Sequence, residues 1–191
     1  MAKSQAMIWK SASGSVGKEL TITQKRSGSI LIGKHRKGNS FDPTDKQQDV
    51  QGRFKVGSIY AKAAMKDPAL KALYQAVALS NNKDQTAYNL ALRDAFMAPE
   101  IQDITTTAYN GAIGSTITIK ALDDFKVAGV KVTITNAAGV VVEQGDAVLL
   151  EEIPVWWVYT ATVLNDQVQG STITVSATDL PKNETVKEVV L

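Results

Sequence analysis

The stretch GSTITIKA at residues 114–121 returns as GSTITVSA at residues 170–177, with six of the eight positions identical. Polar and apolar residues alternate in both copies, which is the period of a half-buried strand. The copies are offset by 56 residues, which is too few for a complete β-sandwich domain, so the repeat predicts two strands of one domain. We assign them as its second and sixth strands, which face each other across the core. The predicted core residues are Ile117, Ile119, Ile173 and Val175.

The same period of two continues on both sides of these stretches, through residues 100–191. Short apolar runs separated by turn residues predict seven strands in about 90 residues, the pattern of an immunoglobulin-like sandwich. With no Cys in the chain, aliphatic packing must replace the disulfide of secreted immunoglobulin domains, at about 1.5–3 kcal/mol for each buried side chain. The predicted strands are 101–109, 115–122, 127–135, 139–143, 154–163, 170–178 and 184–191.

Residues 43–97 instead follow the period of a helix. Thr44 and Gln47 form a capping-box pattern, and Lys66-Asp67-Pro68 ends the first helix because the residue before proline avoids helical angles. The predicted helices are 44–65, 68–79 and 84–96. Their predicted inner residues are Val50, Phe54, Gly57, Ala61 and Ala64, then Leu70, Leu73, Tyr74 and Val77, then Tyr88, Leu92 and Phe96.

The N-terminal part predicts a β-hairpin. Residues 19–24 and 29–32 read as strands, 25–28 as the turn, and Met7-Ile8-Trp9 as a further short strand. A two-stranded hairpin is marginal in water, so it should rest on the helices or on a neighbouring subunit. The expected fold class is therefore α+β, with a hairpin-plus-helix docking domain at 1–97 and the sandwich at 100–191, joined by the linker 97–100.

Composition describes a globular chain of 191 residues, with 44% hydrophobic and 21% charged residues. It contains neither a run long enough for a membrane helix nor the apolar core of a standard secretory signal. Residues 1–66 hold 13 Lys and Arg against 4 Asp and Glu, whereas the rest hold 8 against 15. Such polarity indicates an acidic partner or head-to-tail contact between copies, with a merely solvated surface as the alternative.

The sequence lacks the residue types that most enzyme chemistries require. It has no Cys, and His35 is its only His, which removes thiol nucleophiles, His-based triads and zinc sites of the usual type. The glycines at 14–18 are not a phosphate-binding loop, because Ala12 and Glu19 stand where glycine and Ser or Thr belong, and Lys18 leads into a strand. We expect no enzymatic activity and no organic cofactor.

One candidate metal site remains. In an immunoglobulin topology, the loops after the second and sixth strands lie at the same end of the sandwich. Carboxylates that converge there could hold Ca²⁺, which takes six to eight oxygen ligands. The alternative is that each aspartate bonds the backbone of its own turn. The candidate ligands are Asp123, Asp124, Asp179 and Asn183.

Two sets of residues are candidate interface residues. Trp156 and Trp157 are adjacent on a strand, so one should lie in the core and the other outside, where a tryptophan often marks an interface. The basic set could contact phosphates, but no aromatic stacking platform is interleaved with it, which disfavours specific nucleic-acid recognition. This basic set is Lys25, Arg26, Lys34, His35, Arg36 and Lys37.

Several of these motifs together resemble a family of uncharacterised proteins common in bacteriophages, prophages and Bacteroidetes genomes. They are Gly14-x-x-Gly17, the hairpin with Arg26-Ser27-Gly28, Pro43-Thr44-x-x-Gln47, and Arg53-Phe54. The resemblance covers residues 12–97 and implies no catalytic residue, while residues 100–191 resemble the immunoglobulin-like modules of bacteria and phages, which often decorate virions.

The resulting hypothesis is a non-enzymatic structural or assembly protein, a virion component that is in the host cytoplasm before assembly. Its expected partners are other proteins or copies of itself in a homo-oligomer, with no membrane. Two alternatives stay open: a cell-surface adhesion or carbohydrate-binding module that stacks a tryptophan on sugar, and a DNA-associated protein that uses the basic set.

Overall fold

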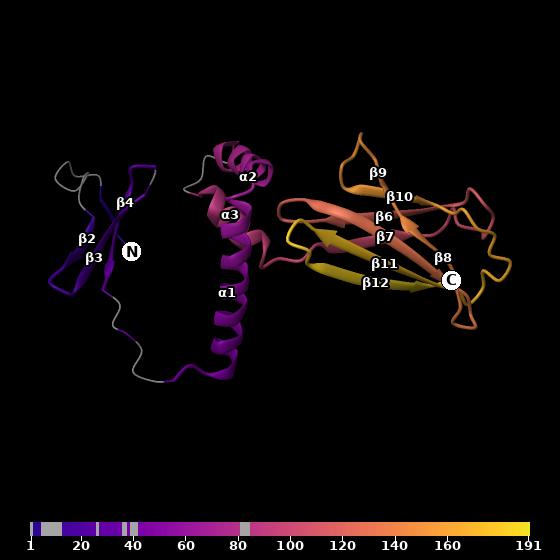
Figure 1. Ribbon diagram of the computed structural model, residues 1–191, viewed down its shortest axis with the longest axis horizontal. Coiled ribbons are helices and arrows are strands. Elements are labelled where there is room, and N and C mark those ends of the chain that lie inside the picture. The colour runs from indigo at the N-terminus through magenta and orange to yellow at the C-terminus, as the bar shows by residue number, and fades with distance from the viewer. Residues whose placement is uncertain (1, 5–12, 26, 36–37, 39–41, 81–84) are drawn as a thin grey trace. The chain divides into compact units, whose positions relative to one another are not determined.

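The computed structural model describes residues 2–4, 13–25, 27–35, 38, 42–80 and 85–191. The chain divides into two compact units, an N-terminal unit of residues 1–91 and a C-terminal unit of residues 92–191. The boundary falls inside the third helix, a few residues before the linker expected at 97–100. Each unit is described separately below (Figure 1).

The N-terminal unit begins with a four-stranded antiparallel sheet. Its order is β1-β4-β3-β2, and its strands are β1 (Ala2–Ser4), β2 (Gly14–Val16), β3 (Leu20–Gln24) and β4 (Ile30–Lys34). The hairpin predicted from the sequence is β3–β4, and Gly28 supplies the positive φ of its turn. The idea of a lone two-stranded hairpin is wrong, because β1 and β2 pair with its two edges. The strand predicted at Met7–Trp9 lies outside the described residues.

Three helices follow, as the periodicity predicts: α1 (Asp45–Ala64), α2 (Pro68–Ser80) and α3 (Ala87–Asp94). At the start of α1, the backbone N–H of Thr44 donates to Gln47 Oε1 over 3.0 Å, the bond expected of a capping box. Asp67 caps α2 by accepting from the backbone N–H of Ala69 at 2.8 Å. The third helix is shorter than predicted, because the hydroxyl of Thr86 caps it from outside.

The core of the helical part is smaller than the sequence predicts. Gly57, Ala61 and Ala64 are buried on α1, but Val50 and Phe54 on the same face are 60% and 53% exposed. Two hydrogen bonds tie the second half of α1, where the buried residues lie, to the other helices. They are Ser58–Tyr88 at 3.1 Å and Tyr60–Tyr74 at 2.9 Å.

On α2 and α3, the predicted inner faces also need correction. Tyr74 is fully buried as predicted, whereas Leu73 is 45% exposed. On α3, Leu90 and Ala91 are buried, while the predicted Tyr88, Leu92 and Phe96 are only half-buried. A spacing of four residues alone drifts around a helix, so it misplaced the buried stripe on so short an element.

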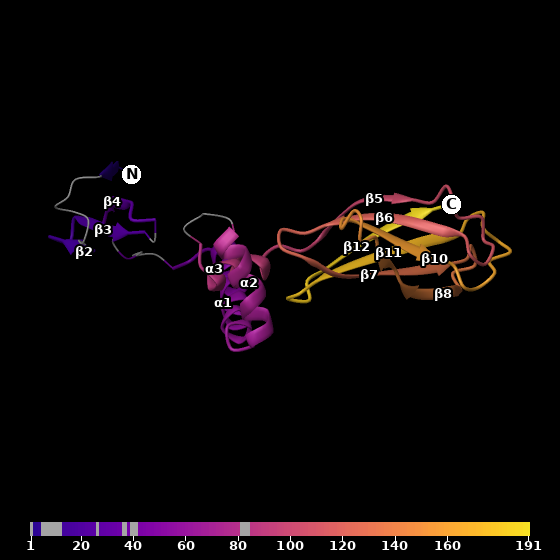
Figure 2. The same ribbon diagram turned by 90° about the horizontal axis from the view of Figure 1, so that it is seen from above.

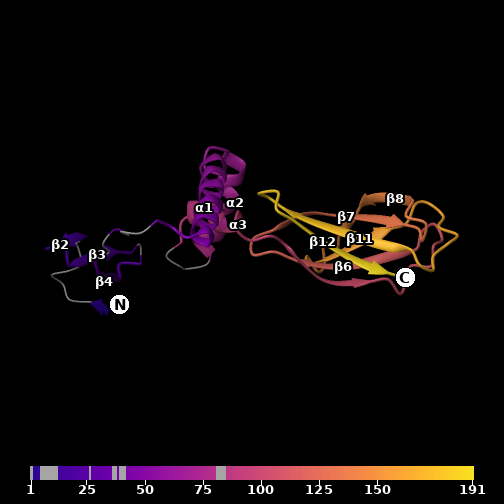
Figure 3. The same ribbon diagram turned by 90° about the horizontal axis from the view of Figure 1, so that it is seen from below.

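The C-terminal unit is a β-sandwich of two four-stranded antiparallel sheets, ordered β5-β6-β10-β9 and β12-β11-β7-β8. Figures 2 and 3 show the sheets as separate layers, with β5 and β6 on one side and β7 and β8 on the other. The strands are β5 (Glu100–Thr105), β6 (Thr116–Leu122), β7 (Val127–Thr135), β8 (Val141–Asp146), β9 (Val148–Leu149), β10 (Trp156–Thr160), β11 (Thr172–Asp179) and β12 (Glu184–Val190). All seven predicted strands are confirmed, and β9 is an addition.

The repeated sequence forms the centre of this sandwich. The two copies are β6 and β11, which belong to different sheets, and the four predicted core residues all have no exposed surface. They belong to one apolar cluster that also takes in Val132, Ile134 and Trp157. Packing across the two layers is what holds this cysteine-free sandwich together.

In the part of the chain that the structure describes, no helix is long and apolar enough to cross a bilayer.

Candidate functional site

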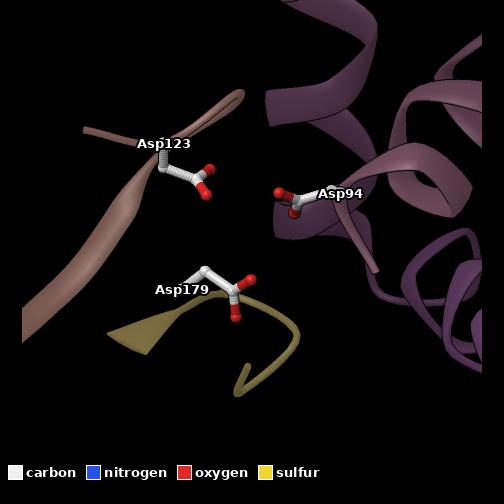
Figure 4. A group of neighbouring side chains, drawn as sticks. All are labelled: Asp94, Asp123 and Asp179. Carbon is white, nitrogen blue, oxygen red and sulfur yellow. The ribbon is translucent and has the colours of Figure 1, made fainter. Parts of the chain in front are cut away.

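Three aspartates meet within the C-terminal unit. Asp94 ends α3, Asp123 follows β6 directly, and Asp179 ends β11. One carboxylate oxygen from each lies within 4.8 Å of the others. Figure 4 shows the three side chains pointing toward one another from three separate segments. The ends of β6 and β11 therefore do come together, as the sandwich topology predicted.

This acidic cluster is largely removed from water. Asp179 has no exposed surface and Asp94 is 2% exposed, while Asp123 is half-buried. Asp179 accepts two hydrogen bonds of 2.7 Å from Asn183, one from its backbone N–H and one from its side-chain amide. Asp123 Oδ2 accepts from the backbone N–H groups of Phe125 and Lys126, whereas its Oδ1 is buried with no hydrogen-bond partner.

Burial raises the pKa of Asp179 above its usual value of 3.8. The hydrogen bonds from Asn183 work in the opposite direction, and the negative charge of Asp123 raises the pKa further. A carboxylate in this position favours a bound proton or a neighbouring positive charge. Three carboxylates in so small a space are therefore stable only if one of these compensates them.

The structure sorts the four predicted ligands into different roles. Asp123 and Asp179 belong to the cluster. Asp124 instead pairs with Arg93, at 2.9 Å between Nη2 and Oδ2. The side-chain amide of Asn183 donates to Asp179 and to the backbone carbonyls of Asp94 and Met97, so it holds the segments of the cluster together. The alternative reading, in which an aspartate bonds its own turn, is true of Asp123 Oδ2.

Asp94 is the member that the sequence analysis missed. It lies inside the predicted third helix, 84–96, and no site residue was predicted there. A signal was present, because an aspartate in the last turn faces the negative end of the helix dipole and is unfavourable there. Such a mismatch suggests that another part of the molecule compensates the charge.

The spacing of the cluster suits a hard divalent cation. Ca²⁺ binds oxygen at about 2.3–2.6 Å, so two of its ligands can lie up to about 5 Å apart. The 4.8 Å limit within the cluster meets that condition. Asp94, Asp123 and Asp179 could supply three oxygen ligands, and water or backbone carbonyls would have to complete the shell. A proton shared within the cluster would neutralise part of the same charge.

A further buried carboxylate, outside the acidic cluster, has a structural role. Glu143 Oε2 accepts hydrogen bonds from the backbone N–H and the hydroxyl of Thr162, at 2.9 and 3.0 Å, and from the backbone N–H of Val163. Burial raises the pKa of the Tyr159 phenol well above its usual range, and the carboxylate of Glu143 adds to this effect. This arrangement fastens the segment after β10 to β8.

The two tryptophans divide as the strand pattern predicted. Trp157 is 7% exposed and lies in the core, whereas Trp156 points to the other face and is half-buried. The ammonium group of Lys120 lies over the Trp156 ring, 5.9 Å from its centroid. This distance is within the range of a cation–π contact. Trp156 is thus the only one of the pair that a partner can reach.

The basic set does not form a single patch among the described residues. Lys25 follows β3 at the turn of the hairpin, while Lys34 pairs with Leu20 at the opposite end. His35 is half-buried beside Lys34, with Nδ1 3.3 Å from the hydroxyl oxygens of Ser15 and Thr21. Arg26, Arg36 and Lys37 lie outside the described residues. The phosphate-binding role of the whole set therefore stays a prediction.

No family model and no curated protein matches this chain. Among solved structures, CopC from Methylosinus trichosporium OB3b is similar over 47% of this chain and 87% of its own, with 14% identity and a TM-score of 0.35. An engineered protein from the Northeast Structural Genomics Consortium is similar over 55% of this chain and 26% of its own, with 16% identity and a TM-score of 0.31. Neither likeness is strong enough to assign a function.

Proposed function

We propose that this chain is a non-enzymatic structural protein that works by assembling with copies of itself or with other proteins, as a component of a bacteriophage virion or a phage-like particle. The observation that carries the proposal is that the charge changes sign at the boundary between the units. The N-terminal unit holds 15 Lys and Arg against 6 Asp and Glu, and the C-terminal unit holds 6 against 13. Opposite net charges of +9 and −7 favour contact between the basic unit of one molecule and an acidic surface of another.

The proposed role of the C-terminal unit is that of a displayed immunoglobulin-like module. Its strand orders support this reading: the second strand of the sandwich pairs with β10, and β11 lies between β7 and β12. Immunoglobulin-like domains usually divide their consecutive strands between two aligned sheets in this way. The resemblance of residues 100–191 to the modules that decorate virions agrees with it.

The proposed role of the N-terminal unit is docking. Large apolar side chains on its strands and helices are more than 40% exposed, which is expected of a surface that a partner covers. The resemblance of residues 12–97 to a family found in phages and prophages is the reason for proposing a phage particle as the assembly. The exposed residues are Val16, Leu20, Val50, Phe54, Val56, Ile59, Leu73 and Leu79.

Sedimentation velocity on the purified full chain tests the proposal. We expect the mean mass to rise with protein concentration at about 50 mM salt and to fall again at about 500 mM, because salt screens the attraction between unlike units. A monomer at every concentration and salt level, together with no protein partner in a pull-down, would contradict an assembly role. Turnover of a small molecule that is lost on a single substitution would contradict the non-enzymatic role.

One observation favours the alternative of a carbohydrate-binding module, namely the accessible part of Trp156. An aromatic ring on a sheet face can stack on a sugar, although the ammonium group of Lys120 already occupies a position over this ring. Glycan binding that disappears in a Trp156→Ala variant would support this alternative. Trp157→Ala is unsuitable for this test, because Trp157 belongs to the core and its loss would disturb the fold.

A further inference from the structure

Helix α1 has two apolar faces, and only one of them is covered. The covered face contains Gly57, Ala61 and Ala64. On the opposite side, four apolar residues follow one another at intervals of four, three and four residues, which is the spacing of a coiled-coil seam. We call this the α1 seam; it consists of Gly52, Val56, Ile59 and Ala63.

The α1 seam is open to solvent. Val56 is 68% exposed and Ile59 is 62% exposed, and Gly52 and Ala63 are exposed as well. The seam does not arise from the amphipathic pattern that packs α1 against α2 and α3, because it lies on the far side of the helix from the buried stripe. Two β-branched residues flanked by two small ones instead suit close contact with another helix.

We propose that the α1 seam binds the α1 seam of a second copy of this chain, with the two helices antiparallel. The seam is self-complementary in this direction. A two-fold axis between Val56 and Ile59 places Val56 opposite the partner's Ile59 and Gly52 opposite the partner's Ala63. Each facing pair then consists of two different residues. The two β-branched residues face each other in the middle of the seam, and the two small residues face each other at both ends.

Charge selects the antiparallel direction. The heptad spacing of the seam continues to Asp49 on one side and to Lys66 on the other, and both residues are exposed. In the antiparallel arrangement, Asp49 lies opposite the partner's Lys66, and this pair occurs twice. A parallel arrangement would place like charges together at both ends, and it would also align the two helix dipoles unfavourably.

Lys55 and Lys62 flank the seam, and in the antiparallel pair Lys55 lies near the partner's Lys62. Their long side chains can turn their charges outward to solvent while their methylene groups cover the seam. The contact spans three helical turns, or about 16 Å, and is small compared with a standard interface of about 1,600 Å². The pair alone should therefore be weak, as befits one of several contacts in an assembly.

The inference deepens the proposed assembly role and rests on it, since it names one contact by which copies join. Cysteine cross-linking of the full chain tests it, because the natural chain has no Cys. We would prepare Gly52→Cys and Ala63→Cys separately; a Cβ at Gly52 meets no atom within 4 Å, so the substitution fits the folded chain. Mild oxidation of the two variants mixed should give a disulfide-linked dimer, because these positions face each other only in the antiparallel pair.

Each variant oxidised alone is the matched control and should stay unlinked, because its own two cysteines would lie far apart. Efficient cross-linking of either variant alone would indicate a parallel pair and would overturn the inference. No cross-link in the mixture, combined with salt-sensitive association in sedimentation, would also overturn the seam contact while leaving the assembly role in place. A monomer throughout would contradict both.

Two further sets of variants probe the energetics without cross-linking. Ile59→Lys should weaken self-association by tenfold or more, whereas Ala76→Lys, at an exposed position of α2 outside the proposed docking surface, should leave it unchanged. Asp49→Lys or Lys66→Asp alone should weaken it by about two- to tenfold, and the double variant should restore it. Equal loss from Ile59→Lys and Ala76→Lys, or no rescue in the double variant, would contradict the proposed register.

Discussion

The two units of this protein bury their apolar residues in different ways. The C-terminal unit gathers fifteen buried apolar residues into a single cluster between two sheets. In the N-terminal unit, only seven of the described apolar residues are buried, and they are divided between the sheet and the helices. Meanwhile α1 leaves Val50, Phe54, Val56 and Ile59 more than half exposed.

This difference indicates that the two units are suited to different roles. A sandwich with a continuous core buries its apolar residues between its own two sheets. A helical unit that leaves apolar residues in water gains free energy when a partner covers them. This difference supports the docking role proposed for the N-terminal unit. The following predictions, from the largest effect to the smallest, can break or refine this comparison.

The largest effect should come from the centre of the sandwich. Ile173→Ala removes a side chain with no exposed surface, and we expect it to lower the free energy of unfolding of the C-terminal unit by about 2–5 kcal/mol. Val56→Ala on α1 is the matched control and should change stability by less than about 0.5 kcal/mol. Urea denaturation, followed by far-UV circular dichroism, measures both. Similar losses in the two variants would show that the units do not differ in this way.

The next effect concerns a glycine in the sandwich. Gly111 has φ +81°, and a Cβ there would lie 2.2 Å from the carbonyl oxygen of Asn165. We expect Gly111→Ala to cost about 3 kcal/mol or more, because both the backbone and the neighbouring segment must shift. Gly114→Ala is the control, since its φ is +88° but no atom lies within 4 Å. It should cost only the conformational strain, about 1–2 kcal/mol.

The acidic cluster predicts a dependence on pH. The folded protein holds a proton on Asp179 at pH values where the unfolded chain has already lost it, because the pKa is raised in the folded state. This contribution to stability is therefore present below about pH 3.8 and is lost as pH rises through the raised pKa. The difference in melting temperature between the natural chain and Asp179→Asn should shift against the natural chain over that interval.

Calcium separates the two ways of neutralising the cluster. At neutral pH, added CaCl₂ should raise the melting temperature of the natural chain but not of Asp179→Asn if the cluster holds the cation. An equal response of both proteins, or none, would leave the proton as the neutralising species. A pH profile that is identical for the two proteins would contradict the raised pKa.

The smallest effect should come from the helical unit. Tyr74→Phe removes the hydrogen bond to the hydroxyl of Tyr60 while keeping the buried ring, so we expect a loss of about 0.5–1.5 kcal/mol. This loss should be confined to the N-terminal unit, and amide hydrogen exchange of α1 and α2 can detect it. Faster exchange in β6 or β11 as well would show that the two units unfold together.

Much of the fold could be predicted because the relevant forces are local or periodic. The alternation in residues 114–121 and 170–177 placed two central strands and their buried side chains, since a strand with one face in a core must alternate. Likewise, Pro68 and the pattern from Thr44 to Gln47 set the ends of the first helix. The buried stripe of α3 was misplaced, because over eight residues several stripes fit a helix equally well.

The candidate site could be predicted only in part. Asp123 and Asp179 end strands that a sandwich brings together, so topology was enough to associate them. Asp94 joins them from a different element; its place in the last turn of a helix marks an unfavourable charge, but does not indicate which residues lie beside it. Asp124 and Asn183 have the right residue types for ligands, but Asp124 faces Arg93 and Asn183 serves as a hydrogen-bond donor within the cluster.

The sequence alone determined the class of each segment, the strand repeat and the division of charge, because backbone propensity, side-chain alternation and net charge are properties of the chain itself. Only the tertiary structure decided how far along α1 the predicted inner face is covered and which aspartates share a site. Those outcomes depend on contacts between residues far apart in the chain, whose distances no local pattern encodes.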